Sequence, residues 1–169
     1  MSVTLEELLK SRDARAAHQK DLLGSHPGKS LLCMTVQLPG PEKRNALSLQ
    51  IAGAGVAAVR QAFPLDYEEL RDLETGYEAY FLLPMAPADA KRIACRLEDT
   101  HPLGRLLDLD VIPGQTGHLR PLGREDIGLP PRRCLLCGNE ARYCMRAKTH
   151  STQELLDKID KMVASYVKA

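Results

Sequence analysis

The stretch Gly104–Val111, which reads GRLLDLDV, decides how the centre of this chain folds. From Leu107 to Val111 apolar residues alternate with aspartates, and this two-residue period is typical of a β-strand with one buried face. The pattern predicts a strand over 105–112 that turns its apolar side chains toward the core. Asp108 and Asp110 then project together from the opposite face.

Two carboxylates this close repel each other, and a bound divalent cation is the usual way to offset that repulsion. Oxygen ligands suit Mg²⁺, which also binds the phosphate groups of a substrate. Gly104 lets a phosphate approach the backbone closely, and the guanidinium of Arg105 is able to contact the same charge. The pattern therefore indicates a phosphoryl-transfer site at Asp108 and Asp110. The alternative is a strand whose aspartates simply face water.

The segments on either side predict a single α+β domain. Thr4 and Glu7 form the sequence pattern of a capping box, which begins an N-terminal helix within residues 1–24. From residue 30 onward the order is β-α-β-β-α-β, typical of a nucleotidyltransferase-like or ferredoxin-like split βαβ core over 30–121. Its expected elements are strands at 30–38, 66–73, 77–83 and 105–112, a short return strand at 118–121, and helices beginning after Asn45 and at Pro87.

Composition limits the class of protein. Of 169 residues 44% are hydrophobic and 27% are charged, as in globular domains. The net charge of +1 argues against a protein that binds nucleic acid by bulk electrostatics. No apolar run approaches the ~20 residues of a membrane helix, and the N-terminus lacks a signal-peptide pattern. We therefore expect a cytoplasmic protein, with no membrane association and with reduced cysteines.

Three of the five cysteines lie close together near the C-terminus. Cys134, Cys137, Cys144 and His150 have the composition of a closed structural Zn²⁺ site. The alternative is a set of reduced thiols in a small helical lobe over 128–169, which ends in an amphipathic helix from about residue 152. Both interpretations fit a reducing compartment.

Basic residues crowd the same region. Such a cluster is able to contact several phosphates, although a solvated basic face is the common alternative. His101, in the loop before the aspartate strand, either contacts phosphate or merely holds the turn. The clustered residues are Arg132, Arg133, Arg146, Lys148 and His150.

The run Gly53–Ala58, GAGVAA, matches the glycine fingerprint of dinucleotide-binding folds. The preceding Asn45 cap and the helical spacing of the apolar residues favour another interpretation. We expect a helix whose small residues allow close packing, and no dinucleotide site.

Two longer motifs carry a resemblance to a known family. The run Leu97–Val111 (LEDTHPLGRLLDLDV) resembles the phosphoribosyl-dephospho-CoA transferases of citrate lyase, also called citrate lyase holo-acyl-carrier-protein synthases. Leu129–Cys137 (LPPRRCLLC), with the residues from Cys144 to His150, is similar to the same family. Leu8–Arg15 and Pro39–Pro41 fit it as well, so the resemblance spans most of the chain, although residues 42–80 match no motif.

The resemblance implies a specific reaction. Enzymes of this family take 2'-(5''-triphosphoribosyl)-3'-dephospho-CoA and attach its phosphoribosyl-dephospho-CoA part to a serine of the apo acyl carrier subunit, releasing pyrophosphate. It implies that Asp108 and Asp110 hold Mg²⁺ and that Gly104 and Arg105 belong to the same signature. A third carboxylate is usual in such sites, and the candidates are Glu98, Asp99, Glu125 and Asp126. A zinc-binding adaptor and a noncatalytic assembly factor for the carrier protein are the alternative functions.

Overall fold

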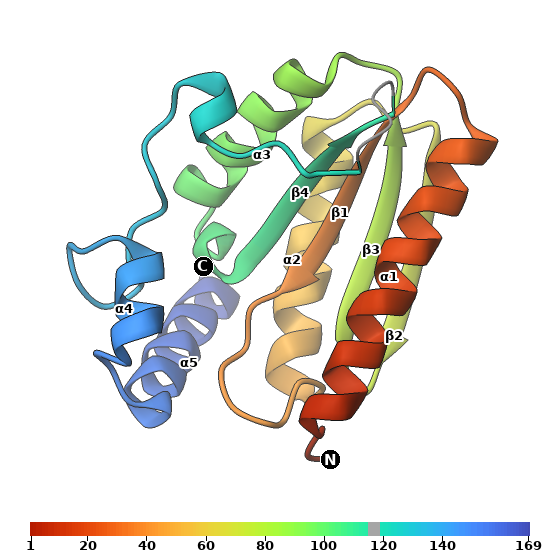
Figure 1. The fold of residues 1–169 in the computed structure, drawn as a ribbon. Helices are drawn as coiled ribbons and strands as arrows, with labels where there is room; N and C mark the ends of the chain where they lie inside the picture. Colours follow the sequence, from red (N-terminus) through yellow and green to blue (C-terminus); the bar gives the residue numbers. More distant parts are fainter. Residues whose placement is uncertain (115–118) are drawn as a thin grey trace.

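A four-stranded antiparallel sheet forms the centre of the computed structural model, which describes residues 1–114 and 119–169 (Figure 1). β1 pairs with both β3 and β4, and β2 pairs with β3, so the spatial order is β2-β3-β1-β4. β4 therefore lies at one edge of the sheet. The expected α+β class is confirmed. The strands are β1 (Ser30–Val36), β2 (Tyr67–Leu73), β3 (Gly76–Leu83) and β4 (Leu107–Pro113).

Three of the five helices in the described chain begin at a side-chain cap. Thr4 caps α1 and Asn45 caps α2, each with a complete capping box, as does Ser151 for α5. Within the described chain no helix is long and apolar enough to cross a membrane. The helices are α1 (Leu5–Ser25), α2 (Ala46–Ala62), α3 (Pro87–Thr100), α4 (Ala141–Ala147) and α5 (Thr152–Lys168), with 3₁₀ turns η1 (Gly104–Leu106) and η2 (Glu125–Ile127).

Two expected boundaries need correction. β4 begins at Leu107 and not at Arg105, because residues 104–106 form the 3₁₀ turn η1 that precedes the strand. The return strand expected at 118–121 begins outside the described residues. Its described part, 119–121, has no strand conformation.

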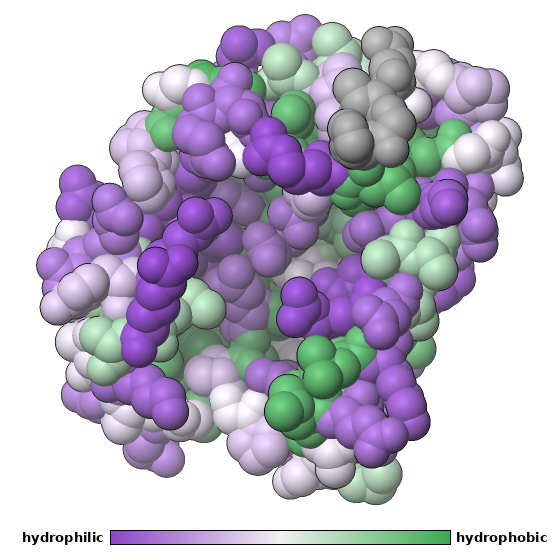
Figure 2. Space-filling view, in the orientation of Figure 1, coloured by the Kyte–Doolittle hydropathy of each residue, from purple (hydrophilic) through white to green (hydrophobic). Residues whose placement is uncertain are grey.

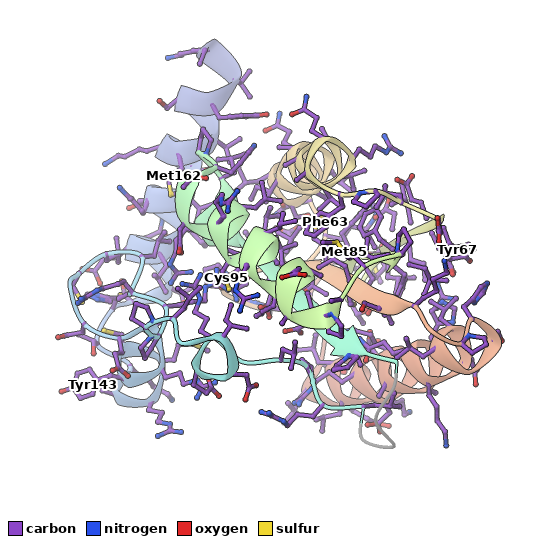
Figure 3. The ribbon with its side chains drawn as sticks, turned by 90° about the horizontal axis from the view of Figure 1, so that it is seen from above. Phe63, Tyr67, Met85, Cys95, Tyr143 and Met162 are labelled. Carbon is purple, nitrogen blue, oxygen red and sulfur yellow. The ribbon has the colours of Figure 1, made fainter. Side chains whose placement is uncertain are left out.

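The sheet has two differently covered faces. Helices α2, α3 and α5 bury one face, and Leu107, Leu109 and Val111 of β4 belong to that core. Helix α1 packs on the other face against a smaller cluster, which includes Ile112 of β4. Figure 3 views the molecule from above. It shows Phe63 and Met85 in the interior, where both belong to or pack against the larger core, and Tyr143 at the outer side of the C-terminal lobe. The expected alternation along β4 is confirmed, and its aspartates point to the α1 face.

The glycines of the run Gly53–Ala58 lie within α2. A Cβ built on Gly55 would lie 2.7 Å from Met34 Sδ, whereas one on Gly53 would meet nothing within 4 Å. The small residue at Gly55 lets the helix approach the sheet, which supports the packing interpretation of this run.

Gly104 is buried where α3 ends and η1 begins. A Cβ at this position would lie 2.1 Å from the carbonyl oxygen of Leu97 and 2.7 Å from that of Glu98. Backbone atoms cannot swing aside as a flexible side chain can. The absent side chain therefore lets the start of β4 approach the last turn of α3.

We expect Gly104→Ala to destabilise the fold by at least about 2 kcal/mol, because the new methyl group forces two backbone segments apart. Gly53→Ala is the matched control, since that methyl group projects into open space in a helix and is expected to stabilise by up to about 1 kcal/mol. Urea denaturation of both variants measures the difference. Equal midpoints for the two variants would contradict this account of Gly104.

Candidate active site

A cleft of about 1170 Å³ lies between the sheet and the C-terminal segment. Asp108 and Asp110 both line it, together with residues of α3, the 121–135 loop, α4 and α5. Figure 2 shows it as a hollow with many hydrophilic residues on the face seen in Figure 1. The two aspartates therefore share one solvent-connected space, as the strand pattern predicted.

The aspartates differ in their surroundings. In the register of β4 on β1, Asp108 lies opposite Thr35 and Asp110 lies opposite Cys33. The Asp108 side chain is 41% exposed and lies 3.5 Å from Arg132 Nη1. No ion pair reaches Asp110 from the described residues. Burial, and next the charge of Asp108, raise the pKa of Asp110 to about 6.

The backbone of β4 faces the cleft along the open edge of the sheet. Edge strands present unpaired N–H and C=O groups, and folded proteins need to cover them. Here side chains and one loop amide supply the missing partners. Leu107 O accepts from Arg132 Nη2 (2.9 Å), Leu109 N–H donates to Glu98 Oε1 (3.0 Å), Leu109 O accepts from Lys91 Nζ (3.1 Å), and Val111 O accepts from Leu122 N–H (2.8 Å).

Glu98 contacts both the edge strand and two arginines of the cleft. Its side chain is 3% exposed and is 2.9 Å from Arg124 Nη2 and 3.7 Å from Arg132 Nη1. Arg124 also holds Asp99 at 2.8 Å. A buried carboxylate with these partners is compensated, so Glu98 fixes two arginines beside the aspartate pair.

The third carboxylate remains a prediction. Of the four candidates, Glu98 and Glu125 line the cleft, and the oxygens of Glu98 are already engaged. Asp126 instead accepts from Arg120 and from the amide of Gly123. Among residues 1–114 and 119–169, no third ligand of the Asp, Glu, His or Cys type gathers with Asp108 and Asp110.

Cationic side chains outnumber carboxylates around the cleft, seven to five. Arg124 and Arg132 are paired with carboxylates, whereas the other five have no such partner in the described chain and remain available to an anion. These five are Lys43, Lys91, Arg105, Arg142 and Lys148.

The structure divides the predicted phosphate-binding residues into two groups. Arg105, Arg132, Lys148 and His150 line the cleft with the aspartates. Gly104, His101, Arg133 and Arg146 do not, and a substrate contact for these four stays a prediction.

Two residues of the second group have local contacts of their own. His101 Nδ1 accepts from the amide of Leu103 at 3.0 Å, so it holds the turn before η1. The carbonyl of Arg133 accepts from Arg105 Nε at 2.8 Å and so links the C-terminal lobe to the start of β4.

The Cys/His cluster predicted from sequence is assembled in space. One ligand atom from each of Cys134, Cys137, Cys144 and His150 lies within 4.8 Å of all the others. The Cys137 and Cys144 sulfurs are 3.5 Å apart, far beyond the ~2.05 Å of a disulfide and close to the ~3.8 Å between sulfurs on tetrahedral zinc.

The surroundings of these ligands suit a metal. The amide of Leu136 donates to Cys134 Sγ at 3.4 Å. The Asn139 amide and the neighbouring His150 ring lower the pKa of Cys137 to about 6, which favours the thiolate that metals bind. His150 Nε2 is buried without a hydrogen-bond partner in the described chain. The donor set and this orphaned nitrogen fit a structural metal ion.

The chain resembles proteins of known family along most of its length. A family model described as apo-citrate lyase phosphoribosyl-dephospho-CoA transferase matches residues 3–166. A Streptococcus pyogenes protein named probable apo-citrate lyase phosphoribosyl-dephospho-CoA transferase is 36% identical, covering 98% of this chain and 88% of that protein. An Escherichia coli protein named apo-citrate lyase phosphoribosyl-dephospho-CoA transferase is 37% identical, covering 96% of this chain and 89% of that protein. Protein CitXG of Haemophilus influenzae is 37% identical over 97% of this chain, which spans 36% of that longer protein.

We expect Asp110→Asn to stabilise the metal-free protein by up to about 3 kcal/mol at neutral pH, because it removes a partly buried charge that Asp108 repels. The pKa of Asp110 rises from 3.8 to about 6 on folding, so the native state binds the proton more tightly than the unfolded state between these values. Wild-type stability therefore falls as the pH rises through this window, and the advantage of the variant disappears below about pH 4.

Thermal melts in EDTA at pH 4 and pH 7.5 measure this difference. Asp157→Asn, an exposed change on α5, is the control and should shift neither melt. A lower melting temperature for Asp110→Asn than for wild type at pH 7.5 would show that the ionised carboxylate of Asp110 does not destabilise the fold.

Proposed function

Because the chain belongs to the family of apo-citrate lyase phosphoribosyl-dephospho-CoA transferases, we propose that the cleft beside β4 is where it carries out that transfer. The family reaction attaches a prosthetic group to apo-citrate lyase, and its partners are the apo acyl carrier subunit and triphosphoribosyl-dephospho-CoA. The observation that carries the assignment of the site is the placement of Asp108 and Asp110 in one cleft among unpaired cations.

The chemistry requires an exchange of oxygen atoms at one phosphorus. The carrier's serine oxygen forms a bond to the α-phosphorus of the triphosphate, and the bond from that phosphorus to the pyrophosphate oxygen breaks. The serine proton ends in the solvent. Because the carrier supplies the nucleophile, this chain needs to hold the triphosphate in line and to stabilise its negative charge.

Asp108 and Asp110 are proposed as the ligands of Mg²⁺. Their fit rests on the donor set, two carboxylates on one strand face, of which Asp110 has no cationic partner in the described chain. When bound, the ion supplies charge neutralisation at the phosphates and at the departing pyrophosphate. Arg132, which lies 3.5 Å from Asp108, is proposed to contact the same substrate phosphates.

The rest of the cleft offers apolar surface, which we propose receives part of the dephospho-CoA moiety. Met145 lines the cleft and is 76% exposed, so its side chain is open to a ligand. Leu38, Pro39, Leu135 and Leu155 line the same space. A substrate with a polyphosphate and a long organic arm matches this combination of charged and apolar lining.

Asp108→Asn and Asp110→Asn are each expected to reduce transfer by about two orders of magnitude or more while the fold survives, because an amide is a poor ligand for Mg²⁺. Mass spectrometry of the carrier subunit, incubated with triphosphoribosyl-dephospho-CoA and Mg²⁺, measures the product. Asp157→Asn should transfer at the wild-type rate. Full activity in both cleft variants would refute the proposed site.

We further propose that the Cys/His cluster holds one structural Zn²⁺. The segment 128–150 is wholly described, yet Cys144 is the only buried residue in it, so it lacks an apolar core of its own. Small units of this kind usually depend on a metal or on disulfides. A reducing cytoplasm, which we propose as the location, would leave these thiols free to bind the ion.

Elemental analysis of the purified protein should find about one zinc per chain. Cys137→Ala is expected to lose the metal and to melt at a lower temperature, because it removes one of four ligands. Cys95→Ala, which changes a buried cysteine outside the cluster, should keep the metal. Wild-type protein that is free of metal and equally stable with and without chelator would exclude the zinc site.

A further inference from the structure

Lys91 is a buried cation that the sequence motifs did not single out. It lies on α3, is 6% exposed, and its Nζ donates to the carbonyl of Leu109 at 3.1 Å. Figure 3 shows Cys95 on the side of α3 toward the 121–135 loop, and Lys91 lies one helical turn earlier on the same side. The ammonium group therefore reaches the edge of β4 between the two aspartates.

The bonding of this ammonium group is incomplete. An ammonium carries three N–H donors, and the described chain supplies one hydrogen-bond acceptor, Leu109 O. No carboxylate of residues 1–114 or 119–169 lies within ion-pair distance, although burying an unpaired charge is costly. Arg124 and Arg132, the other largely buried cations of the cleft, both have carboxylate partners. Lys91 is thus held in the cleft wall with two donors uncommitted.

We propose that Lys91 is a substrate-contacting residue that binds an oxygen of the polyphosphate, at the end that departs as pyrophosphate. The inference rests on the proposed function of the cleft and adds a catalytic residue to it. Lys91 lines the same cleft as Asp108 and Asp110, and Leu109 O holds its ammonium group beside the strand that carries them. A compact, strongly charged donor there matches a terminal phosphate better than it matches an apolar group.

The role is electrostatic and needs no proton transfer. As the bond between the α-phosphorus and the bridging oxygen breaks, negative charge grows on the pyrophosphate oxygens. The N–H groups of Lys91 donate to those oxygens, and the charge stays on the nitrogen. Because the cation is already desolvated and anchored, little reorganisation is required when the charge develops.

A purely structural role is the competing explanation, since Lys91 also covers the edge carbonyl of Leu109. Lys91→Gln separates the two, because it keeps an N–H donor and removes the charge. Lys91→Arg keeps the charge, and Lys91→Met removes both the charge and the donor. Lys29→Met is the control, because Lys29 pairs with Asp66 and does not line the cleft.

The first measurement is calorimetric titration of each variant with inorganic pyrophosphate in Mg²⁺-free buffer without a chelator, so that no Mg²⁺ contributes and the proposed zinc site keeps its ion. We expect Lys91→Gln and Lys91→Met to bind pyrophosphate about 10- to 100-fold more weakly, Lys91→Arg to retain most of the affinity, and Lys29→Met to match wild type. Transfer assays should show a fall in kcat for Lys91→Gln without a fall in melting temperature. Circular dichroism identifies any variant that does not fold, and the test then rests on the remaining two.

The outcomes distinguish this proposal from the function on which it rests. Wild-type protein that neither binds pyrophosphate nor modifies the carrier overturns both. Active wild-type protein together with a Lys91→Gln variant of unchanged pyrophosphate affinity and kcat overturns only the role of Lys91, and leaves it as a cover for the strand edge.

Discussion

The buried carboxylate of Glu98 is the interaction on which the rest of the site depends. It accepts from the amide of Leu109 in β4 and holds Arg124 at 2.9 Å, so one side chain joins α3, the edge strand and the 121–135 loop. Because Glu98 is almost fully buried, removing it would leave the largely buried Arg124 and Arg132 with only the exposed carboxylates of Asp99 and Asp108 as ion-pair partners. The cleft wall therefore has one arrangement of its arginines that is strongly preferred.

Local rules in the sequence were sufficient for the elements and for the central strand. The alternation from Leu107 to Val111 predicted which side chains are buried, and the structure agrees for each of them. The caps at Thr4 and Asn45 located two helix starts because capping depends only on residues within one turn. Composition also indicated the Cys/His cluster, and the motif Leu97–Val111 led to the family.

Other parts of the site depend on contacts between distant segments, which no local pattern records. Lys91 and Arg124 were missed because their roles arise only when α3 and the 121–135 loop pack beside the edge of β4. Glu98 was considered as a metal ligand, and only the structure reveals the two arginines that engage it. A phosphate contact was predicted for Gly104 and stays a prediction, and the structure adds the backbone crowding that this glycine relieves. A polar residue at a helix position facing the core, as at Lys91 and Glu98, is the one signal that was available.

The residues that cover the open edge of β4 also line the cleft, because the cleft lies along that edge. A strand edge must be covered, and this protein covers it with three charged side chains and one loop amide in place of a further strand. Of these covering groups, the ammonium of Lys91 keeps two N–H donors uncommitted in the described chain. In the proposal for Lys91, its ammonium group both protects the edge and binds an anion. A fifth strand would satisfy the backbone of β4 equally well, but it would leave no charged groups beside Asp108 and Asp110.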